Sequence, residues 1–134
     1  MDILNLLTMA VWTVCGVVLL FVLMYVDSLF TKYNDLEELR AGNMAVTTRF
    51  VLKLLAQSYI LSTAISASRQ LGEALIVTVV SFLLLLVMER VVRLLLSRWG
   101  KLELDHGTQL GKVGYGLLSG MLHVAGALII SAMI

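Results

Sequence analysis

The sequence predicts an all-α integral membrane protein with four transmembrane helices, built as two parallel copies of a helical hairpin. Of the 134 residues, 60% are hydrophobic and 14% are charged, and the mean hydropathy is +0.96. Soluble domains are about 45–50% apolar and about 25% charged, so a core this small could not bury the surplus apolar surface. The chain also lacks proline, which loop-rich β folds use in their turns. We therefore expect lipid to surround most of a single domain, residues 1–134.

The first two spans follow from the lengths of the apolar runs. A helix needs about 20 residues to cross a hydrocarbon layer of about 30 Å. The first run, Ile3 to Val26, carries no charge and is much longer than the apolar core of a signal peptide, about 7–15 residues. Asp2 stands where a signal peptide has basic residues, so we expect a retained span. The second run, Met44 to Ala67, contains Arg49 and Lys53.

The third and fourth spans lie in the second half of the chain. The third begins near Leu71, is uncharged from Ala74 to Met88, and continues as a helical pattern towards Trp99. The fourth, Val113 to Ile134, has His123 as its only ionisable side chain.

The basic residues predict the orientation of the four spans. The side of the membrane that receives the segments 27–43 and 90–112, here called the two elbows, is rich in Lys and Arg, whereas the opposite side has only Arg69. Short loops rich in Lys and Arg stay in the cytoplasm, so we expect cytoplasmic elbows and both termini outside. The net charge of +1 predicts no nucleic-acid partner. The basic residues of the elbows are Lys32, Arg40, Arg90, Arg93, Arg98, Lys101 and Lys112.

Weak internal similarity predicts a repeat, with residues 1–68 as the first copy and 69–134 as the second. When Gly42 is aligned with Gly107, Glu38-Leu39 matches Glu103-Leu104 and Ile65-Ser66-Ala67 matches Ile130-Ser131-Ala132. The first and third spans run in the same direction, so the copies would be related by an axis along the membrane normal. Chance similarity between two apolar helices is the alternative explanation.

The first elbow has the residue pattern of a short helix between two spans. Asn34 and Glu37 are spaced as a capping box, Gly42 suits the left-handed conformation that ends a helix, and Asn43 suits the start of the next. In the second elbow we expect Gly107 and Thr108 to take these last two roles.

The apolar residues of the first elbow predict contact with the membrane surface. Leu29, Tyr33, Leu36 and Arg40 fall on one helical face, which predicts an amphipathic segment that lies at the headgroups or extends the first span. We expect Tyr33 and Trp99 to act as interfacial aromatic anchors at matching depths.

The segment Leu39-Arg40-Ala41-Gly42-Asn43-Met44-Ala45 carries a family resemblance. A four-span chain of this length, with an acidic elbow that runs into Gly-Asn-x-Ala, resembles the YjfL-like family of small bacterial inner-membrane proteins. This family is classed as domain of unknown function three hundred and fifty, or uncharacterised protein family seven hundred and nineteen. The resemblance covers essentially the whole chain, although Thr108 replaces the Asn in the second elbow. It implies a multi-pass membrane protein without an established activity, with members encoded near envelope-stress and ATP-grasp, polyamine-related genes.

Charged side chains at membrane depth are costly and are candidates for function. Arg49 and Lys53 lie one helical turn apart, within about 15 Å of the start of their span. One interpretation is that both snorkel to the headgroups. The other is that they pair with Asp27 or Glu89, each at the cytoplasmic end of a neighbouring span, and fix the packing of the helices or line a vestibule for an anionic headgroup or solute.

His123 lies deeper, about two-thirds of the way along the fourth span. We expect no acidic residue at its depth, so an interhelical hydrogen bond is favoured over a proton relay, and no metal or cofactor is predicted. Gln57 and Tyr59 are expected to form similar polar contacts between helices. Cys15, the only cysteine, is expected to pack as a small apolar residue.

Small residues predict where the helices approach each other closely. Ser58, Ser62 and Ser66 repeat every four residues, and the fourth span contains Gly116-x-x-x-Gly120. Such spacing is typical of closely packed membrane helices. We therefore expect the fourth span to be either the central packing helix or a contact between subunits. Ser119, Ala127 and Ser131 lie on an adjacent stripe.

These observations leave two main functional hypotheses. The first is a non-enzymatic membrane component that oligomerises or binds membrane-protein partners, because the elbows are too short for a catalytic domain and no catalytic motif is present. The alternative is a small transporter or channel, which the repeat and the buried charges permit. An intramembrane enzyme is a distant third.

Overall fold

The chain forms a bundle of four long helices with two short helices at one end. The computed structural model describes residues 2–31 and 33–134, so Lys32 lies outside the described residues. Four helices are long and apolar enough to cross a membrane, and the described residues contain no strand. The predicted all-α, four-span class is therefore confirmed. The helices are α1 (Ile3–Ser28), α2 (Asp35–Arg40), α3 (Met44–Ala67), α4 (Leu71–Trp99), α5 (Leu104–Gln109) and α6 (Val113–Met133).

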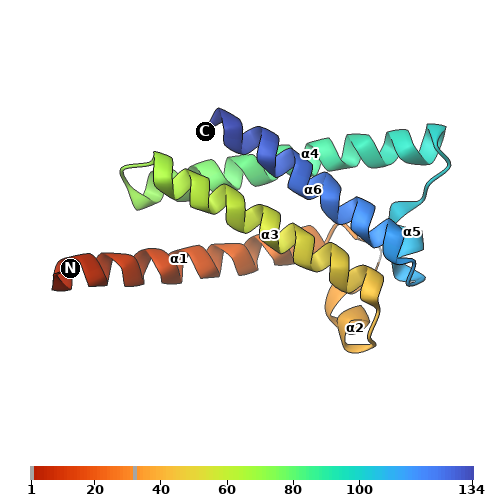
Figure 1. Ribbon diagram of the computed structural model, residues 1–134, viewed down its shortest axis with the longest axis horizontal. Helices are drawn as coiled ribbons and strands as arrows, with labels where there is room; N and C mark the ends of the chain where they lie inside the picture. Colours follow the sequence, from red (N-terminus) through yellow and green to blue (C-terminus); the bar gives the residue numbers. More distant parts are fainter. Residues whose placement is uncertain (1, 32) are drawn as a thin grey trace.

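The helix pair α3 and α6 forms the centre of the bundle, and the two helices cross closely along their length (Figure 1). Glycines permit this approach. A Cβ atom at Gly116 would overlap the backbone carbonyl of Ala45, and one at Gly120 would overlap the side chain of Leu52. The expected role of Gly116 and Gly120 in close helix packing thus agrees with the structure, in which α6 is a central packing helix.

The serine stripe of α3 lies on the outer face of the bundle. Ser62 and Ser66 are exposed and Ser58 is half-buried, and the hydroxyls of Ser58 and Ser66 donate to backbone carbonyls of their own helix. These serines therefore do not contribute to the packing of α3 within one bundle, and their predicted role in close helix contacts stays a prediction for contacts between subunits. The buried face carries alanines, which allow the same close approach without a hydroxyl that needs a partner; they are Ala45, Ala56 and Ala64.

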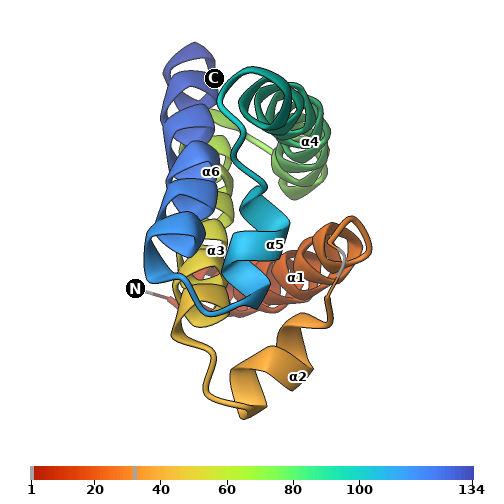
Figure 2. The same cartoon turned by 90° about the vertical axis from the view of Figure 1, so that its right-hand side faces the viewer.

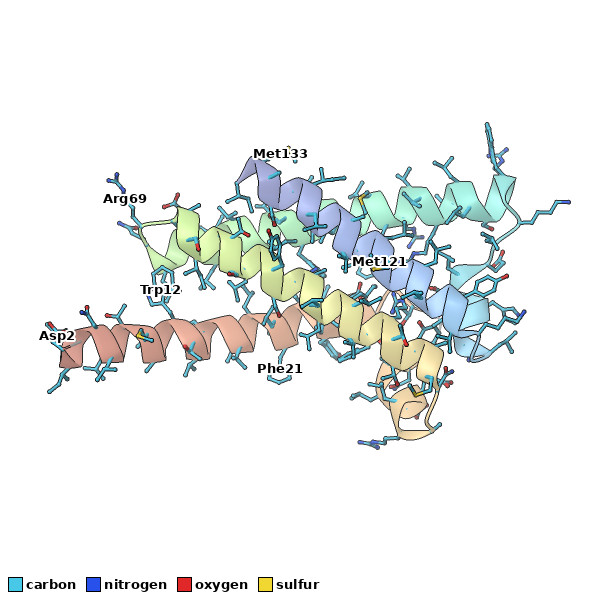
Figure 3. All side chains as sticks on the ribbon, viewed as in Figure 1. Asp2, Trp12, Phe21, Arg69, Met121 and Met133 are labelled. Carbon is cyan, nitrogen blue, oxygen red and sulfur yellow. The ribbon has the colours of Figure 1, made fainter. Side chains whose placement is uncertain are left out.

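Helix α1 is the least packed of the four long helices. Its N-terminal part projects beyond the turn that joins α3 to α4 (Figure 1). In Figure 3, Asp2 lies beyond Arg69 of that turn, Trp12 points towards the turn, and Phe21 points away from the bundle. The buried residues of α1 are confined to its second half and comprise Gly16, Leu23, Met24 and Asp27.

Both elbows lie at the same end of the bundle, and the helix ends of the first lie at the predicted residues (Figure 2). The side chain of Asn34 accepts a hydrogen bond from the Glu37 backbone N–H, which starts α2. Gly42 has a φ of +81°, the left-handed conformation that ends this helix. The Asn43 side chain then accepts from the backbone N–H groups of Ala45 and Val46 and starts α3.

The second elbow corrects the predicted alignment by one helical turn. Gly107 and Thr108 lie inside α5 and are buried, and Gly111, with a φ of +86°, ends this helix. The two elbows therefore share a backbone pattern at a spacing of 69 residues (Gly42 and Gly111, Met44 and Val113), not the 65 residues that align Gly42 with Gly107. Gly107 serves another purpose, because a Cβ atom there would overlap the ring of Tyr115.

The chain between α1 and α2 does not form the predicted continuous amphipathic face. The helix breaks after Ser28, so Leu29 and Leu36 are exposed while Tyr33 is only 6% exposed. Tyr33 is therefore not an interfacial anchor but a buried side chain under the elbow. Trp99, at 82% exposure, has the accessibility that an interfacial anchor requires.

Candidate functional site: a buried network of charges

A network of ionisable side chains lies in the interior of the bundle, and every helix contributes at least one member. We call the following set the buried network: Asp27 from α1, Asp35 from α2, Arg49 and Lys53 from α3, Glu89 and Arg93 from α4, Asp105 from α5 and His123 from α6.

Lys53 is the centre of the network. Its Nζ atom donates to both carboxylate oxygens of Asp27, at 2.7 and 2.6 Å, and lies 3.3 Å from Oε1 of Glu89. All three residues are at most 1% exposed. One ammonium group thus joins α3 to both α1 and α4.

Arg49 continues the network towards the first elbow. Its guanidinium lies 3.9 Å from Asp27 and 3.9 Å from Asp35, and its Nε donates to the hydroxyl of Ser119 at 2.9 Å. The ring of Tyr33 lies 5.9 Å from the guanidinium carbon, within the range of a cation–π contact. Since Arg49 and Lys53 are both buried, the snorkelling interpretation is wrong, and the alternative pairing with Asp27 and Glu89 agrees with the structure.

Arg93 extends the network towards the second elbow. It lies 3.6 Å from Glu89, one helical turn earlier, and 3.1 Å from Asp105. The side chains of Arg93 and Asp105 are 18% and 14% exposed, so this is the most accessible pair of the network. Asp35, Arg93 and Asp105 were not among the predicted site residues. Only the four-residue spacing of Glu89 and Arg93 could have pointed to one of them.

His123 contradicts the expectation that no acidic residue shares its depth. Its Nδ1 atom lies 3.0 Å from Oε2 of Glu89, and both residues are at most 1% exposed. His123 is ten residues from the start of α6 and Glu89 is ten residues from the end of α4. Both are therefore about 15 Å from the elbow end of their helix. The error arose because Glu89, which directly follows the apolar run, was placed at the end of its span, although it lies ten residues before the end of α4.

The same contact revises the expectation about metals. Ligand atoms of Asp27, Glu89 and His123 lie within 4.8 Å of one another, so the carboxylate neighbours that the sequence seemed to lack are present. However, the Lys53 ammonium already lies against both carboxylates, where a metal ion would have to bind. Its positive charge opposes a second cation in the same place, so the geometry is that of an ion-pair network.

Two other polar residues of α3 differ from expectation. Tyr59 is 49% exposed on the outside of the bundle, so its predicted contact between helices is wrong. Gln57 is fully buried as predicted, but within the described part of the chain its amide has no hydrogen-bond partner.

Two side chains of the first elbow, Tyr33 and Asp35, have shifted pKa values. Burial raises the pKa of the Tyr33 phenol above its ordinary value of 10.0, against the opposing effect of Arg49. Burial also raises the pKa of Asp35 above 3.8, and Arg49 again opposes the shift. Tyr33 is thus a neutral neighbour of the charges at physiological pH.

An apolar layer closes the network on the side away from the elbows. Ala56, Ile60, Leu85 and Ala127 form a buried apolar cluster. Ile60 follows Lys53 in α3, Ala127 follows His123 in α6, and Leu85 precedes Glu89 in α4. The layer therefore lies deeper in the bundle than the charged side chains. The polar contacts of these side chains extend from the layer towards the elbows.

Asn43, from the Gly-Asn segment, joins the two elbows beside the network. While its side-chain oxygen caps α3, its amide nitrogen donates to the backbone carbonyls of Thr108 and Gln109, at 3.3 and 2.9 Å, and to Glu38. Gly42 makes these contacts possible because its left-handed conformation turns the backbone at the end of α2, directly before Asn43. These two residues thus position the elbows, while Thr108 contributes a carbonyl instead of a second cap.

The fold and the site define a multi-pass helical membrane protein with a buried ion-pair network. Residues 1–134, the whole chain, match the model of the family described as Domain of Unknown Function (DUF350), so the chain belongs to this family. The resemblance noted in the sequence is thereby confirmed. No curated protein and no solved structure matches the chain.

Proposed function

We propose that this protein is a non-enzymatic, multi-pass component of the bacterial inner membrane that works as a homo-oligomer or bound to a membrane-protein partner in an envelope-associated system. The observation that carries the proposal is the poor packing of α1. Only 11% of its membrane-crossing stretch is buried, compared with 28–39% for the other three spans. Because the other helices cover so little of α1, its exposed surface is available for contact with a second copy of the chain or with a partner protein.

The surface of α1 has features that suit helix contacts as well as lipid contacts. A groove of about 490 Å³ lies between α1 and α3, with Trp12, Gly16 and Leu61 among its lining residues. Glycine and threonine on one side of a span allow a neighbouring helix to approach closely, and Thr8 and Thr13 also line this groove. The remaining apolar surface of the bundle is suited to lipid.

Cysteine cross-linking in native membranes tests the assembly. In a Cys15→Ser background, single cysteines at Leu7, Phe21 and other exposed positions of α1 should give disulfide-linked dimers along one stripe of the helix. Cysteines at Leu83 and Leu84, exposed on α4, are the matched controls and should give few. A monomeric mass in nanodiscs together with no homodimer cross-link from any α1 position would contradict the homo-oligomer, and no cross-link of any kind from α1 in native membranes would contradict the partner as well.

The proposed orientation has cytoplasmic elbows and both termini outside. The arrangement of both elbows at one end of the bundle, with most of the basic residues, supports it. A phosphatase fused after Ile134 should be active outside the cytoplasm, and a fusion within the second elbow at Lys101 should be inactive. The reverse pattern would overturn the orientation.

A small transporter or channel is the second candidate, favoured by the charges of the buried network at membrane depth. The apolar layer of Ile60, Leu85 and their neighbours opposes a continuous polar path through one protomer. Ion flux in proteoliposomes distinguishes the candidates. Flux carried by vesicles of the unaltered protein and absent from protein-free vesicles would favour transport, whereas ion-tight vesicles with an intact oligomer would favour the structural component.

A further inference from the structure

A second groove lies beside the first elbow, between the second half of α1, helix α2 and α3. Its volume is about 760 Å³, within the range of about 300–1,000 Å³ that is typical of sites for small ligands. Figure 1 shows α2 displaced to the side of the bundle, and in Figure 3 Phe21 points outward on this same side. The apolar part of the wall consists of Phe21, Met24, Leu29, Leu36 and Phe50. Such a wall is suited to the apolar chain of an amphiphile.

The groove lies at the depth where lipid head groups meet acyl chains. Helix α3 has 24 residues and is thus about 36 Å long, slightly longer than a hydrocarbon layer of about 30 Å. Asp35, in the wall of the groove, is 3.9 Å from Arg49, which is five residues, or about 8 Å, from the elbow end of α3. Leu29 and Leu36 are 65% and 61% exposed. A lipid of the surrounding leaflet therefore has direct access to the groove.

Two buried polar groups of this wall have no hydrogen bond. The Tyr33 hydroxyl and Oδ1 of Asp35 have no partner among the described residues, and these residues are 6% and 4% exposed. Arg49 is 3.9 Å from Oδ1, beyond hydrogen-bond distance, and donates its Nε to Ser119. An unpaired buried polar group is costly. The two groups therefore suit a ligand that offers both a hydrogen-bond donor and an acceptor.

The neighbouring polar side chains of the wall already have partners. Ser28 and Thr31 donate to backbone carbonyls of nearby residues, and Asn34 accepts the bond that starts α2. The polar contacts of a ligand are therefore expected at Tyr33 and Asp35.

We propose that this groove binds one phospholipid with a primary ammonium head group, of the phosphatidylethanolamine class. The ammonium donates to the Asp35 carboxylate, the phosphate accepts from the Tyr33 hydroxyl, and an acyl chain lies along Phe21, Leu29 and Leu36. The head group brings a positive charge to the carboxylate, whereas an anionic head group would place only negative charge beside it. The site does not depend on the proposed oligomer, because one chain forms the whole groove.

Native mass spectrometry of the full chain in detergent micelles tests the site. Phosphatidylethanolamine, phosphatidylcholine and phosphatidylglycerol with identical acyl chains are titrated separately. The choline head group keeps the positive charge but has no N–H donor. We expect phosphatidylethanolamine to bind about tenfold more tightly than phosphatidylcholine, which corresponds to one hydrogen bond to a charged group. It should also bind more tightly than phosphatidylglycerol.

Variants of the two polar groups locate the lipid. Asp35→Asn should reduce the preference over phosphatidylcholine to about threefold, because a neutral acceptor forms a bond about half as strong. Tyr33→Phe should weaken both lipids equally, since both carry the phosphate. Glu37→Gln, an exposed change on α2, is the matched control and should alter neither affinity. If Asp35→Asn does not fold, the comparison of lipids on the unaltered protein still decides the proposal.

Lys32 provides a further control, because it is the basic residue nearest to Asp35 in the sequence. Lys32→Met should leave the preference for phosphatidylethanolamine unchanged. A preference that appears only in Lys32→Met would overturn the proposal, since the lysine would then be the partner of Asp35.

Two other results would also overturn it. One is equal affinity for phosphatidylethanolamine and phosphatidylcholine in the folded, unaltered protein. The other is tighter binding of phosphatidylglycerol than of phosphatidylethanolamine, which would assign the groove to an anionic head group.

Discussion

Lys53 and Asp27 form the closest charged contact between two spans, with Nζ of Lys53 at 2.6 and 2.7 Å from the carboxylate oxygens of Asp27. Asp27 is one of only four residues that α1 buries, and it lies near the end of this helix. The contact is therefore a principal attachment of α1 to the bundle.

Removal of the Lys53 charge should destabilise the protein strongly. Lys53→Met leaves Asp27 and Glu89 without their shared ammonium in a buried site, and breaking a buried pair in this way costs about 3–5 kcal/mol. The free energy of unfolding, measured by SDS titration in mixed micelles, should fall by this amount. Arg69→Met removes an exposed charge at the opposite end and should change it by less than about 0.5 kcal/mol.

A double-mutant cycle separates the pair from its surroundings. Asp27→Asn combined with Lys53→Met should cost less than the sum of the two single substitutions, by about 1–3 kcal/mol. Additive costs would mean that the two side chains are not energetically coupled.

The glycines of α6 provide a test of the central helix pair. Gly116→Ala places a methyl group on the backbone carbonyl of Ala45, which cannot move without shifting α3, and should cost about 1–3 kcal/mol. Gly114→Ala is the matched control, because no atom lies within 4 Å of the added Cβ. The control should be neutral or stabilising by up to about 1 kcal/mol, because alanine is the better helix former. Equal effects of both substitutions on the SDS midpoint would contradict the packing argument.

The four spans were predictable because membrane helices satisfy their own backbone hydrogen bonds and need only an apolar run of sufficient length. Thus Met44–Ala67 and Leu71–Trp99 agree with the predicted spans, while α1 extends two residues past Val26. The first elbow was equally readable, because the Asn34 cap, the left-handed Gly42 and the Asn43 cap are local signals. The second elbow was misaligned because Gly107 is required by a contact with Tyr115, which no local pattern indicates.

Which residues form the site depends on the depth of each side chain in the bundle and on the rotation of each helix about its axis. A single sequence specifies neither. Pairing of Lys53 with Asp27 or Glu89 was one of two open interpretations, because the length of the lysine side chain suits both snorkelling and pairing. The contact of His123 with Glu89 was missed because Glu89 directly follows the apolar run and was therefore placed at the end of its span, above the depth of His123. Likewise, the serine stripe of α3 faces outward because the rotation of this helix places Arg49 and Lys53 inside.

Asn43 should contribute both to the start of α3 and to the junction of the elbows. Asn43→Ala removes the cap and the bonds to the carbonyls of Thr108 and Gln109. We expect it to cost more than the cap alone, which contributes about 0.5–2 kcal/mol. Asn43→Ser retains a capping oxygen but is too short to reach α5, so its loss should be intermediate. Amide hydrogen exchange should rise in α5 for both variants, and unchanged exchange there would contradict the junction.

Asp35 should make the stability of the first elbow depend on pH. Because burial raises its pKa above 3.8, the folded chain binds this proton more tightly than the unfolded chain. Folding therefore loses stability as the pH rises from the unfolded value through the higher folded value, and the loss then remains constant. Asp35→Asn cannot ionise. The difference between its thermal midpoint and that of the unaltered protein should therefore shift in favour of Asp35→Asn as the pH rises from about 3, and should level off above the folded pKa.

Glu37→Gln, an exposed change on the same short helix, should give a smaller pH-dependent difference. A midpoint that moves in favour of the aspartate with rising pH would instead mean that attraction to Arg49, 3.9 Å away, outweighs the cost of burying the carboxylate.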